Sequence, residues 1–338
     1  MKHLIALVVF ISMNVLAAFI ASAAPLAARA ALPAGCSDVR APFVGTICVP
    51  ATPGRHPAVL LLGGSEGGNS TMPQIAPFFA AHGYVAVTVA YFGLPGLPKH
   101  LVDVPVETIG RALRAVAARN DVNPAEIGIF GGSKGGELAL LAASTYPGIK
   151  AVVADVPSPV AFMGLGANNI PTGCSWSYRG KALPCVPVSP AASAAIGIQF
   201  QRGEPLDLRQ LYDLSLAADP AQVRKSFFHL GRIDGPVLCL AGADDRMWNS
   251  PRQCAMAMRY LKAHHHHYAD RSIVYPHAGH LFLFAMNGPQ SAVVSARLGG
   301  LVMNFGGTKV GDAAAAQRAW TSIWRFLARA LPATGSAR

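Results

Sequence analysis

The chain has 338 residues, of which 52% are hydrophobic and 13% are charged. It is therefore long and apolar enough to bury a large core, and the composition excludes a disordered protein. The net charge is +11, but Lys and Arg are scattered without a run of five and without interleaved aromatic residues, so we expect no nucleic-acid partner.

Residues 1–23 are predicted to be a secretory signal peptide. A short basic start is followed by an apolar core over 4–20 and by the small residues Ala21, Ser22 and Ala23, which have the form of a cleavage site. An uncleaved membrane anchor is the alternative, because the apolar stretch approaches spanning length. We expect an exported protein, periplasmic or secreted, with no stable membrane span after cleavage.

Six cysteines follow the predicted cleavage point, and an even number in an exported chain indicates disulfides. Fifteen pairings are possible. The most local choice pairs neighbours in sequence, giving Cys36–Cys48, Cys174–Cys185 and Cys239–Cys254. The sequence supports the Cys239–Cys254 pair least, since Cys239 lies in an expected buried strand where a free cysteine fits equally well.

Short runs rich in β-branched residues alternate with helical patterns along the chain. The expected strands lie at 46–50, 56–64, 83–93, 126–132, 149–157, 235–245 and 271–280. The expected helices lie at about 72–82, 105–119, 134–146, 250–262 and 313–331. This alternation predicts an α/β fold with a mostly parallel central sheet covered by helices on both faces.

The domain organisation follows from the same reading. An N-terminal segment over 24–56 precedes one catalytic domain over 57–332. Residues 157–235 depart from the alternating pattern and are rich in Pro, Gly and Ser, so they form an insertion. It either covers a site or is an elaborate surface loop.

Ser133 is the candidate nucleophile. It is the centre of a G-x-S-x-G pattern from Gly131 to Gly135, between an expected strand and an expected helix. In α/β-hydrolases this pattern makes a sharp turn whose small neighbours let the serine project from the sheet.

An acid and a histidine follow at the ends of later strands, in the order that this fold uses. Asp245 is expected to orient His280, which serves as the general base for Ser133. Asp244 is the rival acid, and we expect it to cap the following turn instead. His277 is the rival base, and we expect it to be a loop histidine.

The charge that forms when Ser133 attacks a carbonyl requires backbone donors. One is expected from the amide of Lys134, at the helix start. The other is expected from the turn "LLLGGSEGG", with the amide of Ser65 or Glu66 as the candidate. A phosphate cradle is the alternative for this turn, but the spacing and the lysine of a P-loop are missing.

No metal or other cofactor is expected. The four histidines at 264–267 are consecutive, so they cannot all face one ion, and a solvated loop between a helix and a strand is the simpler interpretation.

Several motifs in order resemble one family. The stretches "FGGSKGGELALLAAS", "LAGADDRMWNS", "YPHAGH" and "FGGTKVGDAAAAQRAW" are similar to the C-terminal catalytic domain of acyl-CoA thioesterases and bile acid-CoA:amino acid N-acyltransferases, and the chain also resembles dienelactone hydrolase-like enzymes. The likeness runs from about Pro57 to Leu331. It implies that Ser133, Asp245 and His280 take the nucleophile, acid and base positions.

The resemblance implies a serine hydrolase that cleaves an acyl thioester or ester through an acyl-enzyme. The family's transferases have cysteine at the nucleophile position, so serine favours water as acceptor. Lys134, Arg246 and Arg252 are basic side chains near the site motifs that could contact the phosphates of a CoA handle, although Lys134 could instead pair with Glu137 or Glu66.

Export separates the chain from intracellular acyl-CoA, so a carboxylesterase without CoA specificity is the alternative activity. A catalytically silent hydrolase fold used for binding, and a basic protein that binds the cell envelope, are the alternatives outside catalysis.

Overall fold

A computed structural model describes residues 32–298 and 301–332 of the chain. The predicted signal peptide, residues 1–23, lies outside the described residues. Within the described part of the chain, no helix is both long enough and apolar enough to cross a bilayer.

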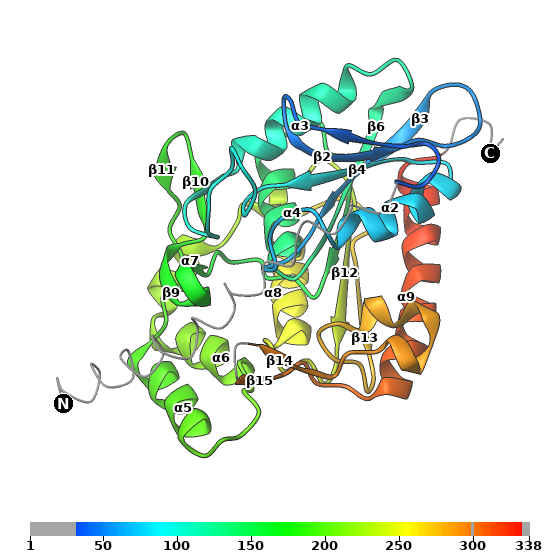
Figure 1. Ribbon diagram of the computed structural model, residues 1–338. Coiled ribbons are helices and arrows are strands. Elements are labelled where there is room, and N and C mark those ends of the chain that lie inside the picture. The colour runs from blue at the N-terminus through cyan, green and yellow to red at the C-terminus, as the bar shows by residue number, and fades with distance from the viewer. Residues whose placement is uncertain (1–31, 299–300, 333–338) are drawn as a thin grey trace.

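An eight-stranded sheet forms the centre of the molecule, in the order β1-β2-β4-β3-β6-β7-β12-β13 (Figure 1). Its strands are β1 Cys36–Val39, β2 Val44–Cys48, β3 His56–Leu62, β4 Val85–Ala90, β6 Val122–Gly132, β7 Ala151–Asp155, β12 Val237–Gly242 and β13 Arg271–Tyr275. The strands from β4 to β13 run parallel, while β1 and β2 pair antiparallel at one edge. The mostly parallel sheet predicted from the sequence is confirmed, and β1 is an additional strand.

Helices cover both faces of this sheet. The helices on one face are α3 Glu107–Ala117, α4 Lys134–Thr145 and α8 Ser250–Ala263, and those on the other are α2 Met72–Ala81 and α9 Lys309–Ala330. All five lie within a few residues of the predicted ranges. The strands between them are buried on both sides, which explains their continuous apolar sequences.

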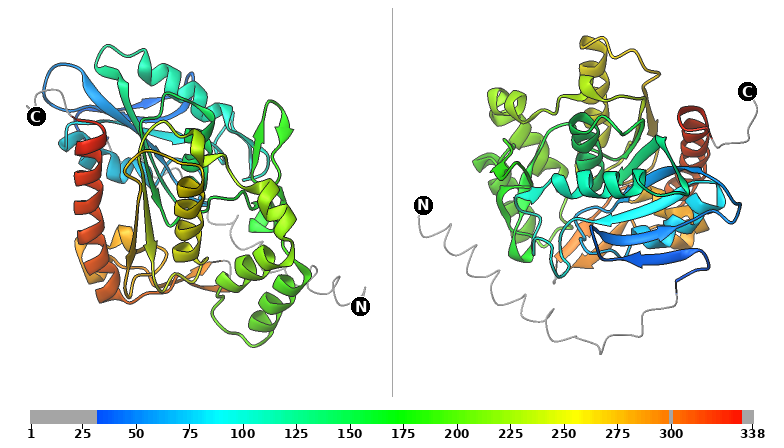
Figure 2. Two further views of the ribbon diagram at one scale, coloured as in Figure 1. Left: turned by 180° about the vertical axis from the view of Figure 1, so that it is seen from behind. Right: turned by 90° about the horizontal axis from the view of Figure 1, so that it is seen from above.

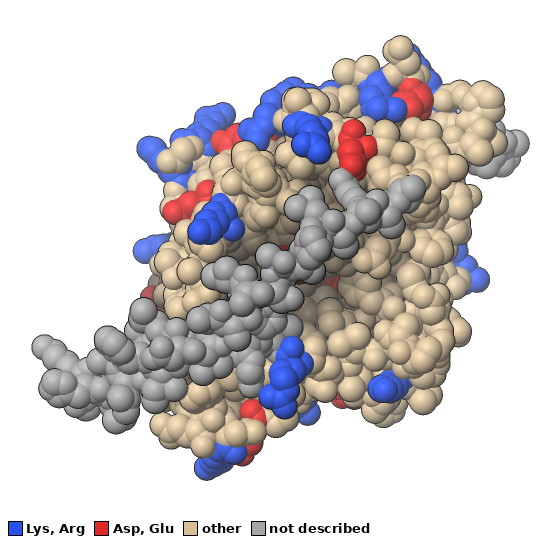
Figure 3. All heavy atoms as spheres, in the orientation of Figure 1, with Lys and Arg blue, Asp and Glu red and all other residues tan. Residues whose placement is uncertain are grey.

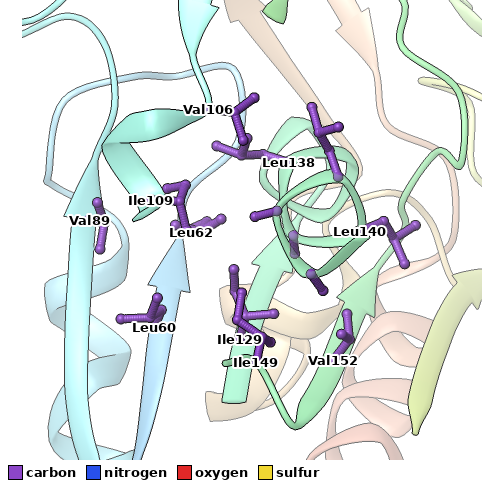
Figure 4. Packing of buried hydrophobic residues seen from close by; sticks show 14 of the residues in the cluster. Leu60, Leu62, Val89, Val106, Ile109, Ile129, Leu138, Leu140, Ile149 and Val152 are labelled. Atoms are coloured by element: carbon purple, nitrogen blue, oxygen red, sulfur yellow. The ribbon is translucent and has the colours of Figure 1, made fainter. Parts of the chain in front are cut away.

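The packing on the α3 and α4 face is close (Figure 4). Leu60, Leu62 and Ile129 project from strands toward Leu138 and Ile109 on the helices, and all five side chains are almost fully buried. This contact fixes the start of α4 relative to the ends of β3 and β6, so the main core also sets the position of Ser133.

The insertion contains more regular structure than its sequence suggested. It comprises β8 Met163–Leu165, η2 Ala167–Asn169, β9 Pro171–Cys174, β10 Trp176–Tyr178, β11 Lys181–Ala182, α5 Pro190–Gln201, α6 Arg209–Ala218, α7 Pro220–Ser226 and η3 Leu230–Arg232. Strand β10 also pairs with the short β5, Val104–Pro105. Helices α5 to α7 lie at the end of the molecule away from α9 in Figures 1 and 2.

The three helices of the insertion were missed although two of them carry clear start signals. Ser189 caps α5 and Asp219 caps α7 through side-chain oxygens that accept backbone N–H groups, and a proline follows each cap. The high Pro and Ser content that looked like a loop therefore partly reflects helix starts.

The chain between β13 and α9 forms short elements. These are η4 Phe282–Asn287, η5 Pro289–Ser291, β14 Ser295–Leu298 and β15 Leu301–Asn304.

The four-histidine loop is only partly solvated. The side chain of His266 is 2% exposed, and its ring nitrogens contact Asp270 and the carbonyl of Ile233. His264 stacks on Tyr260 with ring centroids 4.0 Å apart. The prediction of a wholly solvated loop was therefore wrong for His266, which anchors the loop to its surroundings.

The charged side chains are widely spread. Figure 3 shows Lys and Arg around the margins of one face, with Asp and Glu among them. This distribution agrees with the scattered basic residues of the sequence.

Three disulfides connect the six cysteines in the predicted pairs. Their positions are Cys36–Cys48, Cys174–Cys185 and Cys239–Cys254. The first joins β1 to β2, the second lies within the insertion, and the third joins β12 to α8. Disulfides of this kind are typical of proteins that fold in an oxidising compartment.

The disulfides give the first testable prediction. Protein purified from an oxidising compartment and denatured without reductant should show no titratable thiol, and the reduced sample is the control. Replacing Cys174 and Cys185 together by serine should lower the free energy of unfolding by about 2–4 kcal/mol, because the unfolded chain regains the freedom that the bridge removed. Denaturant titration measures this loss, and six free thiols in the unreduced sample would contradict the pairing.

Candidate active site

Ser133 lies at the sharp turn between β6 and α4. Its backbone has φ 55° and ψ −120°, a conformation that non-glycine residues rarely adopt. A Cβ at Gly131 would lie 2.1 Å from the carbonyl oxygen of Gly135, and one at Gly135 would lie 2.2 Å from that of Gly63. Both flanking positions of the G-x-S-x-G pattern therefore require glycine, as the sequence predicted.

The hydroxyl of Ser133, the ring of His280 and the carboxylate of Asp245 form one hydrogen-bonded chain. Ser133 Oγ is 2.9 Å from His280 Nε2, and His280 Nδ1 is 2.9 Å and 3.1 Å from the two Asp245 oxygens. Asp245 is fully buried and His280 is 4% exposed. The ring can therefore accept a proton from the serine at one nitrogen while the carboxylate holds the other.

The loop after β12 holds Asp245. Its Oδ1 accepts the backbone N–H groups of Met247 and Trp248, at 2.9 Å and 3.3 Å. We had expected Asp244 to cap this turn, but Asp245 does so, because its buried side chain faces the turn's free amides. Asp245 Oδ1 is thus held by the turn amides on one side, while both carboxylate oxygens face His280 Nδ1.

The two rival residues lie together outside this chain of hydrogen bonds. Asp244 Oδ2 is 3.8 Å from His277 Nδ1, and both side chains are exposed, by 46% and 78%. His277 has a φ of 58° on the exposed turn after β13. Of the two acids and two histidines in these motifs, only the Asp245 and His280 side chains are brought to Ser133.

Backbone contacts hold the turn that carries His280. The His280 N–H donates to Phe305 O at 2.8 Å, and the Gly279 N–H donates to Asp312 Oδ1 at 2.8 Å. Trp248 meets the His280 ring edge-to-face, with centroids 5.8 Å apart. Burial raises the pKa of Asp312 to about 6, with the Gly279 amide opposing and the Asp244 charge adding to the shift.

The glycine-rich turn after β3 lies directly beside the serine. A Cβ at Gly64 would lie 3.3 Å from Ser133 Cβ, and Ser65 and Glu66 follow in the same turn. Lys134 is the first residue of α4, so its backbone N–H belongs to the unpaired first turn of that helix. The predicted oxyanion donors are therefore neighbours of Ser133 in space.

The side chain of Lys134 is buried and is held by polar contacts within the protein. It is 2% exposed, and Nζ lies 3.0 Å from Glu137 Oε2 and 2.9 Å from Ser175 Oγ. Burial lowers the pKa of Lys134 and raises that of Glu137, and the attraction between the two opposes both shifts. Of the two roles left open for this side chain, the pairing with Glu137 is confirmed, and a contact with CoA phosphates is excluded because the ammonium is enclosed by the protein.

The two other basic candidates are exposed and ion-paired. Arg246 Nη1 is 3.0 Å from Asp207, and Arg252 Nη1 is 3.0 Å from Asp213. An incoming phosphate would have to compete with these carboxylates.

Asp155 is a buried carboxyl that the sequence analysis missed. It ends β7, between Gly132 on β6 and Leu240 on β12, and its carbonyl accepts the Ser133 N–H at 2.9 Å. Its Oδ1 has no hydrogen-bond partner among the residues that the structure describes. Burial raises its pKa well above the ordinary value, and the charge of Asp245 adds to the shift.

Asp155 and Asp312, which the sequence analysis missed, differ in how far the sequence could have indicated them. Asp155 is a lone acid at the end of a buried strand, where the carboxyl ends of parallel strands meet, so its position could have been noticed. Asp312 lies in the first turn of α9, where an acidic residue is common, and gives no comparable sign. Among the described residues, no cluster of three or more His, Cys, Asp or Glu side chains could hold a metal ion.

Comparisons with known proteins identify the family and the fold. Residues 104–333 match the family model described as BAAT / Acyl-CoA thioester hydrolase C terminal. The chain is 29% identical to the mitochondrial acyl-coenzyme A thioesterase 2 of Mus musculus over 289 residues, covering 85% of this chain and 58% of that protein. It is 27% identical to the acyl-coenzyme A amino acid N-acyltransferase 2 of Rattus norvegicus over 298 residues, covering 86% of this chain and 64% of that one. The chain thus spans less than two thirds of each of these relatives.

Solved structures support the fold. A putative dienelactone hydrolase from Klebsiella pneumoniae superposes with a TM-score of 0.53 at 16% identity, covering 87% of this chain and 98% of that one. A puromycin-hydrolyzing peptidase from Mycobacterium tuberculosis gives 0.54 at 15% identity, covering 88% and 39%. The predicted α/β-hydrolase fold is confirmed.

Asp155 gives a prediction for stability against pH. Its raised pKa means that the folded state retains a proton that the unfolded state releases above about pH 4. The free energy of unfolding therefore decreases as the pH rises from about 4 through the pKa of Asp155 in the folded protein. Asp155→Asn keeps the shape without the ionisation, so it should raise the melting temperature at pH 8 and change it little at pH 4.

Asp234→Asn is the matched control. Hydrogen bonds from Lys150 and Tyr268 lower the pKa of Asp234, so its stabilising effect is fully present above about pH 4 and is lost only as pH falls through the folded pKa. The Asp234→Asn variant should therefore be less stable than the wild type by a nearly constant amount from about pH 5 to 8, whereas the gain in Asp155→Asn grows with pH. Thermal unfolding from pH 4 to 8 measures both. An Asp155→Asn curve parallel to the wild-type curve would show that Asp155 ionises freely in the folded protein.

Proposed function

The chain belongs to the BAAT / acyl-CoA thioester hydrolase C-terminal family, and on this premise we propose that it hydrolyses an acyl ester or thioester through an acyl-enzyme on Ser133. The observation that carries the proposal is the hydrogen-bonded chain of Ser133, His280 and Asp245, with both links within 2.9 Å. The catalytic domain spans 57–332.

Acylation begins when Ser133 Oγ attacks the carbonyl carbon of the substrate and its proton passes to His280 Nε2. The buried Asp245 carboxylate stabilises the imidazolium that forms and keeps Nδ1 protonated. The carbonyl oxygen takes the negative charge and is held by the Lys134 amide and by a second amide of the turn after β3. His280 then gives its proton to the departing alcohol or thiol.

Deacylation repeats these steps with water as the nucleophile. His280 accepts the water proton, the tetrahedral intermediate collapses, and the proton returns to Ser133 Oγ as the acid leaves. Only Ser133 and His280 change protonation in these steps, and Asp245 remains a carboxylate throughout.

A simple acyl ester is the proposed working substrate, with thioester cleavage retained by ancestry. Three disulfides favour export, with residues 1–23 as the signal peptide, and acyl-CoA is an intracellular metabolite. The enclosure of Lys134 and the ion pairs of Arg246 and Arg252 leave little free positive charge near the site motifs for CoA phosphates.

The triad is tested with two sets of neighbouring variants. Ser133→Ala and His280→Ala should each lower kcat by about 10⁴-fold or more, and combining them should cost little further because the residues act as one unit. Asp245→Asn should lower kcat by about 10⁴-fold through the wrong histidine tautomer. Ester hydrolysis and labelling of Ser133 by a fluorophosphonate are the measurements.

Asp244→Asn and His277→Ala are the matched controls, since they change the same residue types one and three positions away. They should retain near-wild-type kcat. Normal turnover by Ser133→Ala would refute the mechanism. A wild-type protein that neither hydrolyses esters nor reacts with the fluorophosphonate would instead favour a silent fold used for binding.

The leaving group is tested by steady-state kinetics on an acyl-CoA, the matched acyl-N-acetylcysteamine thioester and the matched aryl ester. We expect kcat/KM for acyl-CoA to stay within about tenfold of the simple thioester, and its KM to change little between low and high salt, because few phosphate contacts are available to screen. Arg246→Ala should leave this KM unchanged. A large, salt-sensitive advantage for acyl-CoA would overturn the ester assignment and the proposed export.

A further inference from the structure

Tyr91, which directly follows β4, holds the turn beside the nucleophile. Its hydroxyl oxygen lies 2.6 Å from the carbonyl oxygen of Gly63 and 2.9 Å from that of Gly64, and its one proton is shared between these two acceptors. The side chain is 3% exposed. A single buried hydroxyl therefore contacts two consecutive peptide groups of the glycine-rich turn.

The contacts of the Tyr91 hydroxyl with these two carbonyl oxygens fix the direction of the N–H groups in the turn. In a trans peptide the C=O of one residue and the N–H of the next point in opposite directions. With the Gly63 and Gly64 oxygens drawn toward Tyr91, the N–H groups of Gly64 and Ser65 point away from it. The same turn lies against the nucleophile, since a Cβ at Gly64 would lie 3.3 Å from Ser133 Cβ.

We infer that Tyr91 is a positioning residue that holds the oxyanion turn in its active orientation, and that the second oxyanion donor is the amide of Ser65. The inference rests on the proposed function and resolves the choice between Ser65 and Glu66. The Ser65 N–H belongs to the peptide whose oxygen Tyr91 binds, whereas the Glu66 N–H belongs to the next peptide unit. Only the first is fixed by the hydroxyl.

The surroundings of Tyr91 suit this task. Trp176 and Phe92 pack against its ring, with centroids 5.8 Å and 5.3 Å away, so the hydroxyl has little freedom to move. Burial raises the pKa of Tyr91 well above 10, and the charges of Glu66 and Glu137 add to the shift. The phenol therefore keeps its proton and remains a donor throughout the working pH range.

Gly135 contributes to the same arrangement from the other side. Because a Cβ there would lie 2.2 Å from Gly63 O, the start of α4 and the turn meet in backbone contact. The Gly63 oxygen is thus enclosed between the helix start and the Tyr91 hydroxyl. A turn held at this oxygen keeps its distance to the Lys134 amide, the first oxyanion donor.

The test is Tyr91→Phe, which removes the hydroxyl and keeps the ring. We expect kcat per active site to fall by about 10- to 100-fold while KM changes less than about twofold, because a misplaced donor weakens the transition state more than the bound substrate. Active sites are counted by end-point labelling with a fluorophosphonate. Tyr268→Phe is the matched control, since it loses a 2.8 Å hydroxyl bond to Asp234 away from the site and should keep wild-type kcat.

The affinity for a boronic acid distinguishes a misplaced oxyanion donor from a general loss of structure. Ser133 Oγ bonds to boron as its proton passes to His280, and one boronate oxygen then occupies the oxyanion position. The dissociation constant of n-butylboronic acid should rise in Tyr91→Phe by about the same factor by which kcat/KM falls, with full labelling stoichiometry retained.

Three results would overturn the assignment. They are an unchanged kcat, a parallel change in kcat and KM with unaltered boronate affinity, or a loss explained by fewer labelled sites. Each of these leaves the proposed function intact if the wild type is active. An inert wild-type protein would overturn both.

Discussion

The buried pair of Lys134 and Glu137 is the interaction on which the site most depends. Removing two charges from water costs several kcal/mol per ion, and the attraction between them offsets this cost only if their other donors and acceptors are also satisfied. Here Lys134 reaches Ser175 Oγ, while Glu137 Oε1 accepts from Trp176 Nε1 at 2.7 Å and from the Phe162 N–H at 3.2 Å. All three of these partners come from the insertion. The first turn of the nucleophile helix and the insertion are therefore one structural unit.

This unit answers whether the insertion covers a site or is only a surface loop. Its first part, from Phe162 to Tyr178, supports the site from within, because it supplies the partners of the ion pair and places Trp176 against Tyr91. Its later helices pack in a separate apolar cluster that includes Trp248, the residue beside His280. The insertion thus contacts the serine side of the site through Lys134 and the histidine side through Trp248.

The sequence was sufficient for features that depend on local pattern. The order of Ser133, Asp245 and His280 follows from strand-end motifs, because parallel strands bring their carboxyl ends to one edge. It was insufficient for features that depend on distant partners. The sequence indicated Glu137 as a possible partner of Lys134, but it gave no sign of Ser175, 41 residues away. The two carbonyl oxygens near the Tyr91 hydroxyl belong to a turn 27 and 28 residues earlier in the chain. No spacing rule links such pairs, so only the folded arrangement reveals them.

The disulfide between Cys174 and Cys185 lies next to the residues that contact the Lys134–Glu137 pair. Cys174 directly precedes Ser175, and the bridge closes a loop with a sequence separation of 11 that also contains Trp176. Once the bridge has formed, less entropy is lost when these two residues are brought to Lys134 and Glu137. Without the bridge, the full entropy cost of ordering Ser175 and Trp176 falls on the folding of the insertion. Assembly of the surroundings of Lys134 and Glu137 is thereby coupled to the redox state of the compartment in which the chain folds.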